Sequence, residues 1–190
     1  MDTTLACKPR GLALARAVLS LFKLRIGTLI MATALVGLLV TPGAALTKAQ
    51  VAVLALSVLV ASAAAGAFNQ YVEHVSDRLM NRTRRRAFAA GTLPHHPAWL
   101  ALMALMLAGA VAAAWQALNA AAAAYVFLGA FFYGVVYTLW LKRRTPLNIV
   151  IGGLAGSFAV LAGASHSEVA IHQGERGPIT TVGVNALYKN

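Results

Sequence analysis

Charged residues are so sparse in this chain that they leave segments long enough to cross a membrane. Residues 26–47 and 49–72 carry no formal charge, and neither do the 55 residues from Ala87 to Leu141, with histidine counted as neutral. About 20 apolar residues in a helix span the roughly 30 Å hydrocarbon core of a bilayer. Helices satisfy their own backbone hydrogen bonds there. The sequence therefore predicts an all-α fold, a polytopic membrane helical bundle.

We expect about five transmembrane helices. The first two uncharged segments supply one helix each, and the longest is predicted to form two, 97–117 and 121–141, joined by a turn near Asn119. Residues 145–164 are a fifth candidate. Only 11% of the residues are charged, whereas soluble domains carry about 25%. A soluble fold is therefore excluded.

The charge distribution indicates a membrane protein and no nucleic acid partner, although the net charge is +11. Thirteen basic residues come before the first span, after the second or after the fourth, and Lys48 alone lies between the first and second. Cytoplasmic loops of membrane proteins carry such an excess of Lys and Arg. We expect an integral protein of a bacterial inner membrane, with its N-terminus and arginine-rich loop in the cytoplasm.

Asn69, Glu73 and Asp77 follow one another at intervals of four residues where the second apolar segment ends. On a helix they share one face, drifting by about 40° per step. Neither acid has a Lys or Arg three or four residues away, so we expect the pair to lack a protein cation. Two carboxylates and an amide oxygen suit Mg²⁺, and we predict a metal site. The alternatives are solvated acids at a helix end and an amide that packs helices together.

Basic residues follow this motif and recur after the fourth span. Arg82 and Arg86 come shortly after the acids, and Lys142 and Arg143 follow 121–141 on the same side of the membrane. Guanidinium groups bind phosphate oxygens through paired hydrogen bonds. A metal and arginines beside apolar helices are typical of a site for a diphosphate with a lipid tail. Alternatively, the arginines only set the topology and contact lipid headgroups.

Two motifs in this setting resemble the UbiA superfamily of intramembrane prenyltransferases, and within it the haem O synthase (protohaem IX farnesyltransferase) family. The resemblance covers about residues 20–163. The second family motif, Tyr-Thr-x2-Leu-Lys-Arg-x-Thr-x2-Asn-Ile-x-Ile-Gly-Gly, corresponds to residues 137–153, and Lys23 and Arg25 resemble the Lys-Pro-Arg that opens the first span. The first motif is matched by Asn69, Glu73, Asp77, Met80, Arg82, Thr83 and Arg86.

The resemblance implies transfer of a farnesyl group from farnesyl diphosphate to a vinyl group of protohaem IX, giving haem O, with Mg²⁺ as cofactor. It implies membrane lipid as surroundings, and haem A synthase or oxidase assembly proteins as partners. The alternatives are a UbiA-type prenyltransferase with an aromatic or quinone-precursor acceptor, and a non-catalytic membrane assembly or haem-carrying subunit. The expected metal-binding residues are Asn69, Glu73 and Asp77, which are catalytic together with Lys142. The expected substrate-binding residues are Arg82, Arg86, Arg143 and Tyr137.

The resemblance ends after the fifth span, whereas the family has about nine spans and a second Asp-rich motif. We therefore expect a cytoplasmic tail over residues 1–22, an incomplete UbiA-like membrane domain over 23–164 and an atypical polar tail over 165–190. A fragment, a truncation or a shifted reading frame each agrees with this pattern. Since the family's second motif supplies the other half of the metal site, we expect the isolated chain to have little or no activity.

Overall fold

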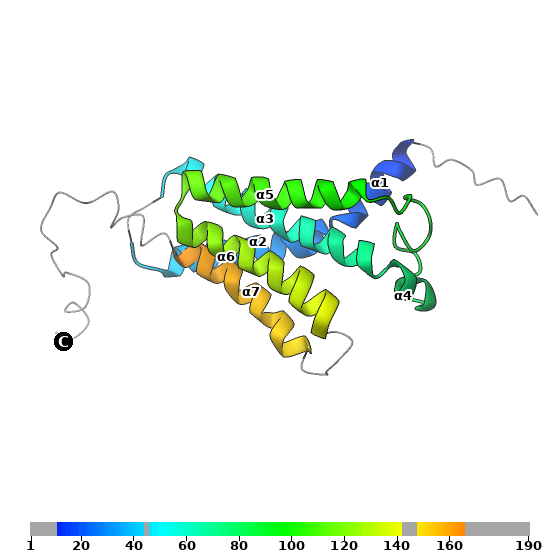
Figure 1. Ribbon diagram of the computed structural model, residues 1–190. Helices are drawn as coiled ribbons and strands as arrows, with labels where there is room; N and C mark the ends of the chain where they lie inside the picture. Colours follow the sequence, from blue (N-terminus) through cyan, green and yellow to red (C-terminus); the bar gives the residue numbers. More distant parts are fainter. Residues whose placement is uncertain (1–10, 44–45, 142–147, 166–190) are drawn as a thin grey trace, which may run out of the picture.

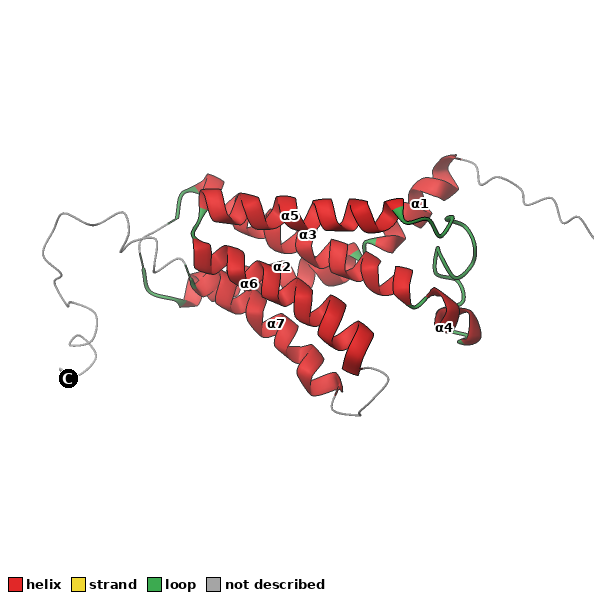
Figure 2. Cartoon of the chain, viewed as in Figure 1, coloured by secondary structure: helices red, strands yellow, loops and turns green. Residues whose placement is uncertain are grey.

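The described part of the chain consists of helices joined by turns and loops. The computed structural model describes residues 11–43, 46–141 and 148–165, and within these ranges there is no strand (Figure 2). The helices are α1 (Gly11–Leu21), α2 (Leu24–Val40), α3 (Lys48–Val72), α4 (His74–Leu79), α5 (Ala98–Ala117), α6 (Ala120–Phe131), the π-helical segment η1 (Phe132–Leu141) and α7 (Asn148–Ala164).

The structure confirms the predicted all-α membrane bundle. Each of the five predicted spans overlaps a helix of the structure. Two of the helices begin at a polar capping side chain: Thr47 caps α3, and Asn119, which accepts a hydrogen bond from the Ala122 amide at 2.6 Å, caps α6. The chain is an integral membrane protein. The described helices that are long and apolar enough to cross a membrane are Leu14–Val40, Lys48–Val72, Ala98–Ala117 and Ala120–Leu141, and Gly153–Ala164 is a shorter apolar helix.

The helices pack into an elongated bundle (Figure 1). Helix α3 packs between α2 and α5, and α7 packs against α2 and α6. One end of the bundle carries the turn between α5 and α6, and the other carries α1, α4 and the loop that follows α4 (Figure 1). The motif acids and the arginines of residues 78–86 therefore lie together at a single end.

Small residues allow the helices to approach one another closely. The main core is rich in alanine, including Ala34, Ala61 and Ala114. A methyl group added to Gly37 would meet the backbone of Val160, and one added to Gly163 would meet the backbone of Ala34. In lipid, where apolar tails surround the helices, such close packing is a principal source of association. These two glycines hold α2 against α7.

Residues 11–21, expected within the N-terminal tail, form helix α1. Its last residue, Leu21, is fully buried and packs against Ala67 and Phe88. The side-chain amide of Gln70 donates hydrogen bonds to the carbonyls of Ser20, at 3.2 Å, and Leu21, at 2.8 Å. The end of α1 is thereby fixed to α3, and α2 begins shortly afterwards at Leu24.

Candidate functional site

Asn69, Glu73 and Asp77 keep a common face although α3 ends at Val72. The Glu73 amide donates to the Asn69 carbonyl at 3.1 Å, and the Asp77 amide donates to the Glu73 carbonyl at 2.8 Å. Helical hydrogen bonding therefore links each motif residue to the next across the boundary between α3 and α4. The three residues are 3%, 6% and 3% exposed. Solvated acids at a helix end are thus excluded for this pair.

Arg86 occupies the point where the two carboxylates converge. One of its terminal nitrogens donates to Asp77 Oδ1 at 2.9 Å and to Asp77 Oδ2 at 2.8 Å. The same nitrogen lies 3.8 Å from Glu73 Oε2. The expectation that the acids lack a protein cation is wrong, because the partner comes from a turn of the chain and not from the same helix face. Burial of both acids makes such a counter-charge necessary.

The loop after α4 folds back to deliver Arg86. Thr83 is buried, and its hydroxyl donates to the Asp77 carbonyl at 3.1 Å. The Leu93 amide donates to the Ala87 carbonyl at 3.1 Å, and both side chains are buried around Phe88. The residue that follows Arg86 is therefore anchored in an apolar cluster, which holds the guanidinium over the acids.

Asn69 is held between two other elements. Lys23 Nζ donates to Asn69 Oδ1 at 3.1 Å, and Asn69 Nδ2 donates to Thr138 Oγ1 at 3.2 Å. Lys23 lies between α1 and α2 in the left-handed conformation, with φ 45° and ψ 44°. Non-glycine residues adopt this conformation at a cost and concentrate at functional sites. Asn69 thus joins α3 to η1 and to Lys23, contacts that both the predicted metal ligand and an amide that packs helices together would make.

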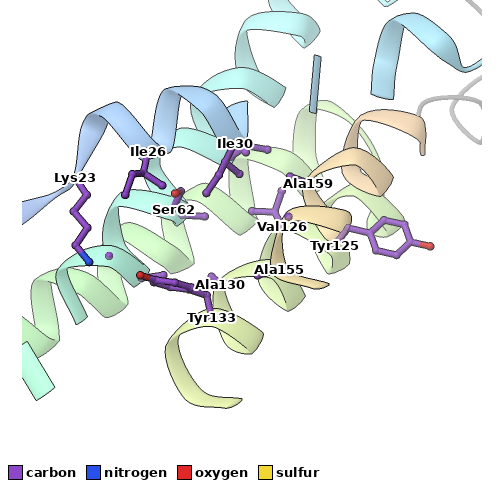
Figure 3. Close-up of a pocket in the computed structure, with 16 residues that line it drawn as sticks. Lys23, Ile26, Ile30, Ser62, Tyr125, Val126, Ala130, Tyr133, Ala155 and Ala159 are labelled. Carbon is purple, nitrogen blue, oxygen red and sulfur yellow. The ribbon is translucent and has the colours of Figure 1, made fainter. Parts of the chain in front are cut away.

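An apolar cavity of about 190 Å³ opens beside these residues. It is formed by α2, α3, α6, η1 and α7, and its lining is aliphatic except at Lys23, Ser62, Tyr125 and Tyr133. Figure 3 shows the Lys23 ammonium and the Tyr133 hydroxyl at the same end of this cavity. Lys23, at this end of the cavity, also donates its hydrogen bond to Asn69 of the motif. The cavity is therefore mostly apolar, and Lys23 and Tyr133 form a polar end that is joined to the motif through Asn69.

The remaining predicted site residues have different outcomes. Tyr137 stacks on Tyr133, with ring centroids 5.6 Å apart and ring planes 14° apart. Arg82 is exposed, and among the five arginines of residues 78–86, all of which are described, Arg86 is the one in an ion pair with the acids. Lys142 and Arg143 lie outside the described residues. Their predicted roles, like that of Arg82, stay predictions.

Residues 30–181 match the model of the UbiA prenyltransferase family. The chain belongs to the UbiA prenyltransferase family. Its relatives include protoheme IX farnesyltransferase 2 of Paramagnetospirillum magneticum, 58% identical over 151 residues, which are 79% of this chain and 52% of the relative. A second is protoheme IX farnesyltransferase of Granulibacter bethesdensis, 40% identical over 159 residues, or 84% of this chain and 50% of the relative. The chain spans about half the length of these curated relatives. No solved structure matches it.

The donor set of this UbiA-family chain fits a magnesium ion. Its oxygens are hard, as Mg²⁺ prefers, and Mg²⁺ is commonly bound by one or two carboxylates with substrate phosphates completing its shell. Each proposed ligand residue already contacts a protein cation, Arg86 for the two acids and Lys23 for Asn69. Among the described residues, no group of three His, Cys, Asp or Glu side chains is placed to bind a metal.

Two residues at this UbiA-family site were not assigned a role from the sequence. Lys23 lies 46 residues from Asn69, and Thr138 lies 69 residues from it. Both belong to segments that resemble family motifs, which is the only signal the sequence offers. No local pattern predicts that either side chain contacts Asn69.

Proposed function

We propose that this chain forms the first diphosphate-binding half-site of a protohaem IX farnesyltransferase. The reaction is transfer of the farnesyl group of farnesyl diphosphate to a vinyl group of protohaem IX, giving haem O. The observation that supports it is a mostly apolar cavity lined at one end by Lys23, which contacts Asn69 of the motif whose two buried acids pair with Arg86. The relatives named protoheme IX farnesyltransferase support a farnesyl donor and a protohaem acceptor.

The cavity receives the apolar chain of the prenyl donor, and its polar end receives the diphosphate. Burial of the chain among aliphatic side chains favours binding by the hydrophobic effect. Lys23 and Arg86 donate hydrogen bonds to diphosphate oxygens, and Arg86 does so after it releases one of its acid partners. Arg82, Lys142 and Arg143 are further candidates for this contact, because they belong to the two basic motifs.

Asn69, Glu73 and Asp77 would hold Mg²⁺, which supplies charge neutralisation and Lewis acidity toward phosphate oxygens when bound. Lys23 and Arg86 act on the leaving diphosphate. The bond between carbon 1 of the farnesyl group and the diphosphate oxygen breaks, and the electron pair leaves with the diphosphate. Fixed cations at Lys23 and Arg86 stabilise this developing negative charge in a site that excludes bulk water.

The allylic cation left behind is captured by the π electrons of a haem vinyl group. The new bond joins the farnesyl carbon to the terminal vinyl carbon, and water then adds at the inner carbon and loses a proton, which leaves a hydroxyl group. Tyr133, with Tyr137 stacked against it, presents an aromatic ring near the polar end of the cavity. The negative face of such a ring stabilises a cation.

A binding assay and a turnover assay together test this function. The purified 190-residue chain, reconstituted in lipid, is expected to bind radiolabelled farnesyl diphosphate only when Mg²⁺ is present. Conversion of haem B to haem O is followed separately by chromatography, because the chain spans about half the length of its relatives. Binding that is equal with Mg²⁺ and with excess chelator would contradict the proposed site.

The N-terminus and the arginine-rich loop are proposed to face the cytoplasm of a bacterial inner membrane, where haem A synthase or oxidase assembly proteins are the proposed partners. In a Cys7→Ser background, Arg85→Cys should react with an impermeant maleimide in inside-out vesicles and not in spheroplasts. Gly43→Cys, in the loop at the other end of the bundle, should show the reverse, since both positions are exposed. The opposite labelling pattern would overturn the orientation.

A further inference from the structure

Thr138 connects the π-helical segment η1 to Asn69 through a buried hydroxyl. The residue is 3% exposed. Thr138 Oγ1 donates to the Tyr133 carbonyl at 2.8 Å and accepts from Asn69 Nδ2 at 3.2 Å. A threonine hydroxyl carries a single hydrogen. Because that hydrogen is used on Tyr133, the oxygen presents only lone pairs to Asn69, and an amide nitrogen is the group that fits there.

The other neighbour of Asn69 requires the same orientation. The Lys23 ammonium has three hydrogens and no lone pair, so the Asn69 atom that faces it at 3.1 Å must be the amide oxygen. Reversing the amide would place a donor against Lys23 and an acceptor against the lone pairs of Thr138. The two contacts therefore define one orientation of the Asn69 side chain, with its oxygen on the Lys23 side.

The π-helical winding of η1 explains why the Thr138 hydroxyl donates to Tyr133 and is left to accept from Asn69. In an α-helix, a threonine hydroxyl reaches the carbonyl three or four residues earlier. Here the hydroxyl reaches Tyr133, five residues earlier, within a segment wound as a π-helix from Phe132 to Leu141. The π-helix is rare and occurs mostly as single-turn bulges in α-helices, which are frequently found at functional sites. This winding brings together the cavity residue Tyr133 and the partner of Asn69.

We infer that Thr138 is a positioning residue that fixes the Asn69 amide oxygen toward the Lys23 end of the cavity. There the oxygen faces the place where the diphosphate and its metal are proposed to bind, so this inference rests on the proposed function. Without Thr138, the amide nitrogen loses its acceptor, and the contact with Lys23 alone orients the Asn69 side chain. Partners that orient metal ligands typically change metal affinity 10- to 100-fold when removed.

The test is a calorimetric titration of Mg²⁺ into the full chain in the presence of inorganic diphosphate. Thr138→Val, which keeps the shape and removes the hydroxyl, should raise the Mg²⁺ concentration for half-maximal binding about tenfold. Thr138→Ser should restore nearly wild-type binding. Thr41→Val is the matched control, because Thr41, the C-cap of α2, donates a similar helical hydrogen bond to Gly37 at 2.8 Å. The loop from α2 to α3 lies at the end of the bundle away from α4 (Figure 1).

A double-mutant cycle separates positioning from a general structural effect. If Thr138 acts through Asn69, adding Thr138→Val to Asn69→Ala should cause no further loss of Mg²⁺ affinity. Equal affinity in Thr138→Val and wild type would overturn the inference alone. So would a loss of about tenfold in the Mg²⁺ affinity of Thr138→Ser relative to the wild type, a comparison that does not need the valine variant to fold. Absence of Mg²⁺-dependent binding in the wild type would overturn the proposed function together with this inference.

Discussion

Replacing Glu73 with Gln and Asp77 with Asn together should abolish Mg²⁺-dependent binding of farnesyl diphosphate, with a loss of at least about 100-fold in affinity. Both side chains are buried, and both converge on a single nitrogen of Arg86. The amides keep the size of the side chains and remove the negative charge that a divalent cation requires. Binding is measured with radiolabelled farnesyl diphosphate over a range of Mg²⁺ concentrations.

A second double variant controls for the change in net charge. Glu168→Gln with Glu175→Gln removes the same two charges at positions outside the described residues, and it should bind as the wild type does. Circular dichroism should show unchanged helix content in both double variants. If the Glu73→Gln, Asp77→Asn double variant binds with wild-type affinity and keeps wild-type helix content, the two acids are not part of the binding site.

Arg86→Gln should destabilise the metal-free protein by roughly 3 kcal/mol, since breaking a buried ion pair leaves uncompensated charge. The two acids are 8% and 4% exposed at their side chains, and Arg86 is 26% exposed. In the variant the carboxylates of Glu73 and Asp77 lack the positive charge of Arg86, and a bound Mg²⁺ would supply positive charge in its place. Mg²⁺ should therefore raise the melting temperature of this variant more than that of the wild type. Ligand binding to the folded state alone stabilises it in this way.

Arg84→Gln provides the matched control for Arg86→Gln. Arg84 lies two residues earlier in the same loop and is exposed, and exposed arginines contribute little to stability. Its melting temperature and its response to Mg²⁺ should equal those of the wild type. If Mg²⁺ stabilises the Arg86→Gln variant no more than the wild type, Arg86 does not occupy a cation site.

Much of the fold was predictable because membrane insertion imposes a strong constraint. The predicted spans 49–72, 97–117 and 121–141 begin one residue away from the observed helical segments and end at the same residues. Uncharged segments of this length have few alternatives to a helix in lipid. The polar connection at Asn119 was equally readable, since an asparagine before an apolar run is a common helix start.

The partners of the motif residues were not predictable. Arg86 follows Asp77 by nine residues, a separation that no helical periodicity relates, and it reaches the acids only because residues 80–93 fold back on the apolar cluster around Phe88. The contact of Lys23 with Asn69 depends on the break between α1 and α2. Neither lysine nor the residues beside it predict the left-handed backbone conformation found there. Thr138 depends on π-helical winding, which periodicity does not distinguish from an α-helix.

The sequence by itself determined an integral membrane bundle of helices, the spacing of Asn69, Glu73 and Asp77 on one face, and membership of the UbiA prenyltransferase family. These follow from local properties, namely charge-free length, helical period and motif order. Only the tertiary structure decided that the acids are buried with Arg86, that Asn69 is held between Lys23 and Thr138, and that a cavity adjoins them. Such contacts join side chains distant in sequence, and their geometry depends on how the helices pack.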